Sequence, residues 1–175
     1  LETGAFRRGN FVLSSGRRST YYIDGRLVTL HPEGAYLTGR LIFERMRGQG
    51  IEAVGGLTLG ADPVVTAVAI ASYAAGEPIL GFIVRKEPKQ HGTGQLIEGP
   101  LQAGARVAIV EDTVTTGGSV LKAVAAAEQA GCTVAKIVAL IDRCEGAASV
   151  FAEHGLPFEA IFTIRDFGVE LGEGD

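Results

Sequence analysis

The feature that most constrains the fold is an alternation of short, almost continuously apolar runs with longer segments of helical spacing. The apolar runs cover residues 51–57, 79–84, 106–110 and 134–141. They lack the polar alternation of a strand that has one face in water, which indicates burial on both faces. Helical segments separate most of these runs, as in parallel sheets. The sequence therefore predicts an α/β fold with a central, mostly parallel sheet and helices on both faces.

Further elements complete this pattern. Helices are predicted over 62–75, 119–130 and 147–154, and a last strand is predicted over 158–164. Pro32 suits a first helical turn and is followed by apolar residues at helical spacing, which predicts a helix over 32–50. Apolar runs at 11–13 and 21–23 flank a turn-rich segment and predict an N-terminal strand pair. Ligands of such sheets bind beyond the carboxyl ends of the strands, so the residues there are the candidate site.

Length and composition limit the architecture and the partners. With 175 residues, 46% of them hydrophobic, the chain can bury a core of its own, and residues 1–175 are predicted to form a single domain. The net charge of −4 disfavours a nucleic acid held through its phosphates. No apolar run is long enough for a membrane span, and the two cysteines have no metal-ligand spacing. We therefore expect a cytoplasmic protein without a membrane or nucleic-acid partner.

Two acids and a segment rich in hydroxyl groups and glycine follow the strand predicted at 106–110. Glu111 and Asp112 come first, and the segment leads into the helix predicted from Ser119. Backbone N–H groups before a helix can bind an anion, and carboxylates facing the same crevice can accept hydrogen bonds from vicinal ribose hydroxyls. The simpler alternative is a helix capped by Ser119 beside two solvated acids. Capping explains Ser119 but not the two acids that precede the segment.

This segment resembles the signature of type I phosphoribosyltransferases for phosphoribosyl pyrophosphate (PRPP), in which a hydrophobic strand and two acids precede Thr-Val-Thr-Thr-Gly-Gly. The resemblance implies the type I phosphoribosyltransferase fold, with a small hood of roughly residues 1–30 over the sheet. It also implies that Glu111 and Asp112 hold the ribose 2- and 3-hydroxyls. The residues implied to bind the 5-phosphate are Thr113, Val114, Thr115, Thr116, Gly117, Gly118 and Ser119.

A basic segment follows the strand predicted at 79–84. Its cations and the glycines after them predict a mobile lid over roughly residues 85–100, with a solvated charged loop as the alternative. The run Arg-Lys-Glu-Pro-Lys-Gln-His-Gly resembles a loop that marks orotate phosphoribosyltransferases. Cations at this place would stabilise the negative charge that develops on a departing pyrophosphate. The residues that the resemblance assigns to pyrophosphate binding are Arg85, Lys86, Lys89 and His91.

Three further segments resemble the same family. Asp-Arg-Cys-Glu-Gly at 142–146 is similar to a motif whose arginine contacts orotate, which implies that Arg143 binds the base. An arginine can pair its donors with a planar carbonyl or carboxylate, although an ion pair with Asp142 or Glu145 is equally compatible with the sequence. The turn at 58–63 resembles a loop that contacts pyrophosphate through its backbone. The hood resembles a cover for the base, with backbone groups near Tyr22 as candidates.

Taken with the residues, the resemblance predicts transfer of the phosphoribosyl group from PRPP to orotate, which gives orotidine 5-phosphate and pyrophosphate in pyrimidine biosynthesis. Lys86, Lys89 and Asp112 are the expected catalytic residues. The protein would have no resident metal, Mg²⁺ would arrive with PRPP, and a homodimer would share the lid between subunits. One alternative is a phosphoribosyltransferase for another base, which should lack the basic motif. The other is a non-catalytic PRPP sensor, which should carry a nucleic-acid-binding surface.

Overall fold

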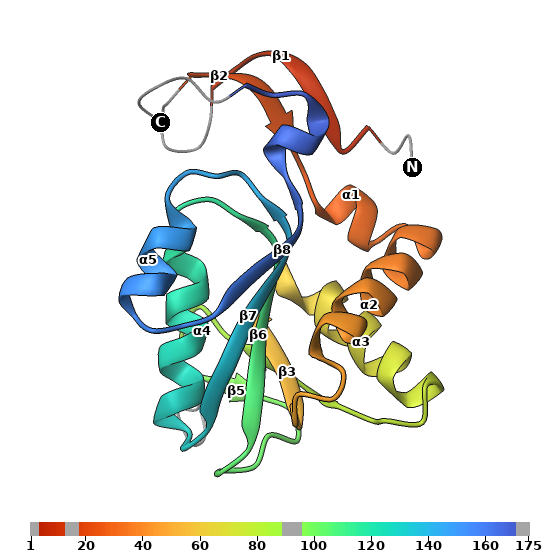
Figure 1. Ribbon diagram of the computed structural model, residues 1–175, viewed down its shortest axis with the longest axis vertical. Helices are drawn as coiled ribbons and strands as arrows, with labels where there is room; N and C mark the ends of the chain where they lie inside the picture. The colour runs from red at the N-terminus through yellow and green to blue at the C-terminus, as the bar shows by residue number, and fades with distance from the viewer. Residues whose placement is uncertain (1–3, 13–17, 89–95, 171–175) are drawn as a thin grey trace.

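The computed structural model describes residues 4–12, 18–88 and 96–170 and contains a six-stranded sheet in the order β5-β4-β3-β6-β7-β8 (Figure 1). Every neighbouring pair in this sheet is parallel except β4 and β5, so the sheet is mostly parallel, as predicted. The strands are β3 (Ala53–Leu57), β4 (Leu80–Val84), β5 (Ile97–Glu98), β6 (Arg106–Val114), β7 (Thr133–Asp142) and β8 (Phe158–Thr163).

Helices cover both faces of the sheet, with α2 and α3 on one side and α4 and α5 on the other (Figure 1). Alternate residues of β6 pack in opposite directions. Ala108 and Val110 lie in the core formed with α2 and α3, whereas Val107 and Ile109 lie in the core formed with α4. This double burial explains why the strand sequences are almost continuously apolar. The helices are α2 (Pro32–Met46), α3 (Ala61–Ala74), α4 (Gly118–Gln129) and α5 (Ala147–Glu153).

The hood lies across the carboxyl edge of the sheet (Figure 1). It contains the antiparallel strands β1 (Phe6–Val12) and β2 (Arg18–Ile23), followed by the short helix α1 (Arg26–Thr29). Tyr21 and Ile23 of β2 point down into an apolar cluster with the end of β7 and with the 3-10 helix η1 (Ile164–Phe167). Both hood strands begin before the predicted runs at 11–13 and 21–23, because residues 7–10 of β1 are all exposed and the start of β2 is polar, so neither shows an apolar pattern. Residue 13 of the first predicted run lies outside the described residues.

Several predicted boundaries differ from the structure. The helix predicted over 32–50 ends at Met46, because Gly48 and Gly50 take left-handed conformations in the turn that follows. The elements α1, β5 and η1 were not predicted, since none has more than four residues and so none shows a period. No helix in the described ranges is long and apolar enough to cross a bilayer.

The prediction that a strand covers only 106–110 is wrong in its end point. Strand β6 continues to Val114, and its ladder with β7 runs on to the pairing of Val114 with Asp142. Glu111 and Asp112 therefore lie inside a buried strand and not in the loop after it. The strand continues because backbone pairing, which is independent of side-chain polarity, extends past the apolar run.

Candidate active site

Two buried acids at the end of β6 form the centre of the candidate site. Strand β3 pairs with β4 on one side and with β6 on the other, so the sheet order reverses here, which is where open α/β sheets bind ligands. A Cβ atom on Gly60, in the turn after β3, would lie 2.6 Å from Oε1 of Glu111 and 2.7 Å from Oδ1 of Asp112. Both carboxyl groups of this acid pair therefore lie close to one point of the neighbouring turn. This is unusual, because the side chains of adjacent residues in a strand normally point to opposite faces of the sheet.

Burial controls the charge of the acid pair. Desolvation, together with the negative charge of Asp112, raises the pKa of Glu111 to about 8. Desolvation also raises the pKa of Asp112, and the backbone N–H of Thr113, 2.7 Å from Oδ1 of Asp112, acts in the opposite direction. Glu111 is therefore the member of the pair that retains a proton near neutral pH. A ligand that donates hydrogen bonds to both acids would favour their ionised forms.

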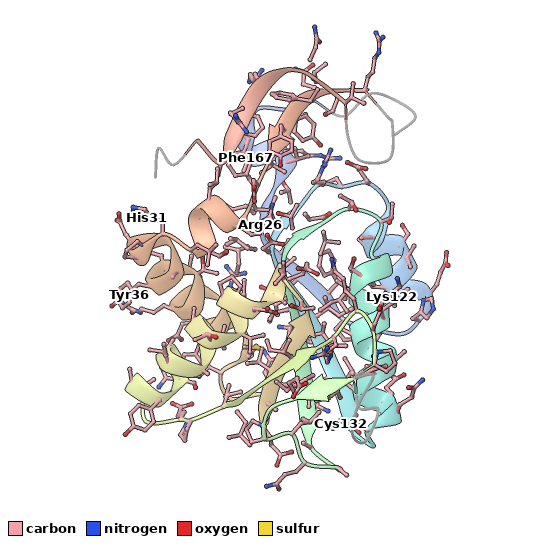
Figure 2. The ribbon with its side chains drawn as sticks, turned by 180° about the vertical axis from the view of Figure 1, so that it is seen from behind. Arg26, His31, Tyr36, Lys122, Cys132 and Phe167 are labelled. Carbon is pink, nitrogen blue, oxygen red and sulfur yellow. The ribbon has the colours of Figure 1, made fainter. Side chains whose placement is uncertain are left out.

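The connection from the hood covers the acid pair from the other side. A Cβ atom on Gly25 would lie 2.9 Å from both Oδ2 of Asp112 and Oγ1 of Thr113. The next residue, Arg26, forms a two-pronged ion pair with Asp24, with Nε 3.0 Å from Oδ1 and Nη2 3.1 Å from Oδ2. The positive charge of Arg26 offsets part of the rise that desolvation causes in the pKa of Asp112. Figure 2 shows Arg26 at the base of the hood.

A short loop leads from β6 to the first turn of α4. Gly117 is the N-cap residue of α4, takes a left-handed conformation with φ 85°, and leaves the helix without a side-chain cap. The alternative in which Ser119 caps this helix is therefore wrong, because Ser119 already lies within the first turn. The first N–H groups of an α-helix have no partner within the helix and can bind an anion. Oγ1 of Thr113 adds a buried donor without a partner among the described residues.

The segment after β3 contains a second buried oxygen atom that has no hydrogen-bond partner within the described ranges. Oγ1 of Thr58 donates a hydrogen bond to Oδ2 of Asp62 at 2.8 Å. The other carboxylate oxygen, Oδ1, is buried without a hydrogen-bond partner in the described part of the chain. Gly60 is the N-cap residue of α3, so Asp62 lies in the first turn and does not cap the helix.

Arg143 follows β7 and lies beside the end of β6. Its backbone N–H donates to the carbonyl of Val114 at 2.9 Å, which joins the end of β7 to the end of β6. Its side chain is buried, and Nη2 lies 2.8 Å from Oε1 of Glu145. The ion pair considered from the sequence is thus present with Glu145, while Oδ1 of Asp142 accepts a hydrogen bond from the backbone of Cys144. The ion pair keeps the guanidinium at the edge of the site.

Comparisons with known proteins agree with this geometry. The model of the phosphoribosyl transferase domain family matches residues 51–152. Orotate phosphoribosyltransferase of Rhodopirellula baltica is 46% identical over 97% of this chain and 91% of its own length, and that of a Nostoc species is 50% identical over 93% and 79%. The crystal structure of orotate phosphoribosyltransferase from Mycobacterium tuberculosis in complex with PRPP is 43% identical, with a TM-score of 0.78 over 91% of this chain and 90% of that one.

The chain belongs to the orotate phosphoribosyltransferases. Its type I phosphoribosyltransferase fold and its enzyme class, a pentosyltransferase, follow from this membership. The family domain covers the sheet from β3 to α5, whereas the hood lies outside the matched residues.

Strands β4 and β5 flank the basic segment that the sequence predicts to be a lid. The backbone N–H of Arg85 donates to the carbonyl of Leu96 at 2.8 Å, and Nη1 of Arg85 lies 3.3 Å from Oε1 of Glu98. Arg85 thus links the end of β4 to β5, while Lys86 is exposed. Lys89 and His91, the other two residues predicted to bind pyrophosphate, lie outside the described residues.

The donor set around the acid pair fits Mg²⁺. This ion prefers oxygen ligands, retains several waters and is commonly held by one or two carboxylates together with substrate phosphates. Carboxylate oxygens of Glu111 and Asp112, and the unpartnered Oδ1 of Asp62, are ligands of that kind. Within 4–12, 18–88 and 96–170, no group of three or more His, Cys, Asp or Glu side chains is placed to hold a metal alone. The carboxylates could therefore supply only a few of the ligands of Mg²⁺, and the others would come from water and substrate phosphates.

Sequence reasoning missed three residues that touch this site: Tyr21, Gly25 and Arg26. Tyr21 and Ile23 are two positions apart in β2, and both side chains are buried. This spacing of large side chains could have indicated which face of the hood points toward the sheet. Nothing in the local pattern indicates that Gly25 and Arg26 approach Asp112, because that proximity depends on how the hood returns to the sheet.

Proposed function

We propose that this chain transfers the 5-phosphoribosyl group of PRPP to N1 of orotate, with orotidine 5-phosphate and pyrophosphate as products. The observation that best supports the assignment of roles is the hydrogen bond between the backbone of Arg143 and Val114. Because this bond joins the ends of β6 and β7, the arginine proposed to bind the base lies near the acid pair of β6. One ligand with a planar, anionic base and a phosphorylated ribose can span these groups.

In this proposal different parts of the substrate bind to the residues that follow different strands. Glu111 and Asp112 accept hydrogen bonds from the ribose 2- and 3-hydroxyls, and residues 113–119 bind the 5-phosphate at the uncapped start of α4. Arg143 donates to the planar base. The turn at Gly60 faces the acid pair and offers its backbone to the pyrophosphate. The carboxylates of Glu111 and Asp112 could assist in holding Mg²⁺ that arrives with PRPP, and the ion would supply positive charge near the pyrophosphate.

The chemistry then needs no covalent enzyme intermediate. The bond between the anomeric carbon and the pyrophosphate oxygen breaks as the bond to N1 of orotate forms, and both electrons of the broken bond leave with pyrophosphate. The proton that N1 of orotate carries is released in the same reaction and is accepted by the departing pyrophosphate or by water. The cations of the lid, Arg85, Lys86, Lys89 and His91, stabilise the charge on the departing oxygens. Asp112, near the electron-poor sugar carbon, stabilises the positive charge that develops there. Positioning and exclusion of water supply the rest of the rate increase.

We further propose a homodimer whose lid reaches over the partner's site. The exposed outer face of α3 supports this, because Ile70 and Tyr73 are 65% and 79% exposed beside a surface hollow of about 620 Å³. Large exposed apolar side chains that adjoin a hollow are typical of interfaces. The proposal includes a single domain over residues 1–175 and a location in the cytoplasm, where Cys132 and Cys144 would stay as free thiols.

Product analysis tests the proposed function. The protein is incubated with PRPP, Mg²⁺ and one of orotate, uracil, hypoxanthine or adenine, and the products are separated by chromatography. Orotidine 5-phosphate from orotate alone is the expected result. Turnover of another base would overturn the choice of base but keep the PRPP site. Binding of PRPP without turnover of any base would indicate a PRPP-sensing regulator.

A further inference from the structure

One side chain of the hood reaches the candidate base-binding arginine directly. Tyr21 of β2 is buried, and its hydroxyl oxygen accepts a hydrogen bond from Nε of Arg143 at 3.2 Å. The guanidinium carbon of Arg143 also lies 4.9 Å from the centre of the Tyr21 ring. The two residues are 122 positions apart in the sequence, so this contact forms only when the hood is seated on the sheet.

Tyr21 is itself held firmly. Its ring stacks on Phe6 with centroids 6.0 Å apart, and Phe6 in turn stacks on Phe167 at 5.2 Å. Ile23 and Ile164 belong to the same apolar cluster. A side chain packed in this way has little rotational freedom, and a hydrogen bond to it transmits that restriction to its partner.

Three contacts together restrict the guanidinium of Arg143. Its backbone is tied to Val114, its Nη2 pairs with Glu145, and its Nε and one face are taken up by Tyr21. A guanidinium carries five N–H donors, so these contacts do not exhaust it and leave donors for a planar ligand. An arginine fixed before the ligand arrives loses less conformational entropy on binding than a free one.

We propose that Tyr21 is a positioning residue for base recognition, which orients Arg143 through its hydroxyl group and its ring. This inference rests on the proposed function, in which Arg143 binds orotate. It adds that the hood contributes to base affinity through Tyr21 without a contact of its own to the base. Glu145 holds the same guanidinium through Nη2, whereas Tyr21 holds it through Nε.

Steady-state kinetics with each substrate varied in turn test the inference. Tyr21→Phe keeps the ring and its packing but removes the hydroxyl group. The KM for orotate should rise about tenfold, the loss expected for one hydrogen bond from a charged donor. The KM for PRPP should stay within about twofold, and the melting temperature within about 2 °C, because the apolar cluster is unchanged. Glu145→Gln should also raise the KM for orotate selectively.

The structure offers a matched control pair on α2. There Nη1 of Arg40 donates to the Tyr36 hydroxyl at 3.3 Å and the guanidinium lies 5.7 Å from the ring centre, away from the site (Figure 2). Tyr36→Phe removes the same kind of contact and should leave both KM values unchanged. In an Arg143→Lys background, Tyr21→Phe should cause no further loss, because Tyr21 acts through Arg143.

Three results would overturn the inference: an unchanged KM for orotate in Tyr21→Phe, an equal rise in both KM values with a lower melting temperature, or a full additional loss in the Arg143→Lys background. Failure of the proposed function is a separate observation. In that case the wild-type protein forms no orotidine 5-phosphate, and the inference falls with it before any variant is compared.

Discussion

At the scale of single residues, the acid pair shows how burial and function conflict. Glu111 and Asp112 are 7% and 9% exposed, and two adjacent buried acids destabilise each other when both are ionised. The backbone of Gly60 and Gly25 covers them at distances that leave no space for another side chain. A hydrophobic pair would fold more easily here, so the acids are retained at a cost in stability, as is common at functional sites.

The raised pKa of Glu111 predicts how stability depends on pH. In the unfolded chain Glu111 loses its proton near pH 4.5, whereas in the folded protein it does so near pH 8. Between these values the folded state binds more protons, so the free energy of unfolding falls as the pH rises, by up to about 1.4 kcal/mol per pH unit. Glu111→Gln should make this decline much shallower, as measured by urea unfolding between pH 5 and 8.5, because only Asp112 of the acid pair would then retain a raised pKa.

The exposed Glu128 of α4 provides the control for that experiment. Glu128→Gln should keep the pH dependence of the wild-type protein. A Glu111→Gln protein whose stability still declines over the same range as steeply as the wild type would show that another group causes the decline.

Gly60 predicts a loss of activity that exceeds the loss of stability. In Gly60→Ala, the new methyl group would lie 2.6 Å from Oε1 of Glu111 and must displace the acid pair. We expect the KM for PRPP to rise about tenfold or more, because carboxylates displaced from the ribose hydroxyls no longer bind them. Gly76→Ala is a useful control, because that glycine follows the far end of α3 and has a left-handed φ of 77°. An alanine there should lower the stability through backbone strain but leave the KM for PRPP unchanged. Unchanged PRPP kinetics in Gly60→Ala would contradict the place of the turn in the site.

At the scale of elements, the sequence predicts the strands that are buried on both faces. It does not predict features that depend on contacts between distant parts of the chain. The apolar runs identify β3, β4, β6 and β7 because those strands are buried on both faces. They do not show that β6 continues through Glu111 and Asp112, since the ladder with β7 is set by the partner strand. Likewise, the motif at 142–146 indicates Arg143, but its contact with Tyr21 depends on the placement of the hood.

The lid is an element whose contribution to catalysis can be separated from stability. Lys89→Ala should lower kcat about a hundredfold, because a cation that stabilises the departing pyrophosphate acts mainly in the transition state. The melting temperature should stay the same. Lys122→Ala, on the exposed side of α4 (Figure 2), is the matched control and should leave kcat unchanged. Near-wild-type turnover in Lys89→Ala would refute the role of this residue.

At the scale of the whole molecule, the exposed apolar side chains on the outer face of α3 predict that two copies of the protein associate there. Ile70 and Tyr73 project from this face next to the hollow beside β4, the strand that leads into the lid. A second copy docked there would bury the apolar side chains near the base of the lid. Assembly and catalysis would then depend on the same region of the molecule.

An Ile70→Asp/Tyr73→Asp double variant tests this dependence. Two buried charges at an interface are unfavourable, so the variant should be a monomer in light scattering at concentrations where we expect the wild type to be a dimer. Its turnover should fall at least tenfold, because a lid that acts across the interface then has no partner site. A folded monomer with full activity would show that the lid serves its own subunit.

The contact between the first hood strand and the segment after β8 has a consequence for biosynthesis. The guanidinium of Arg8 donates hydrogen bonds to the carbonyl oxygens of Phe167 and Gly168, 159 and 160 residues further along the chain. At a translation rate of roughly 5–20 residues per second, Arg8 is added to the chain at least about 8 seconds before those partners. The first hood strand therefore has to wait for these contacts until β8, the last strand of the sheet, has also been made. The packing of the hood against the segment after β8 is thus one of the last parts of the fold to be completed during synthesis.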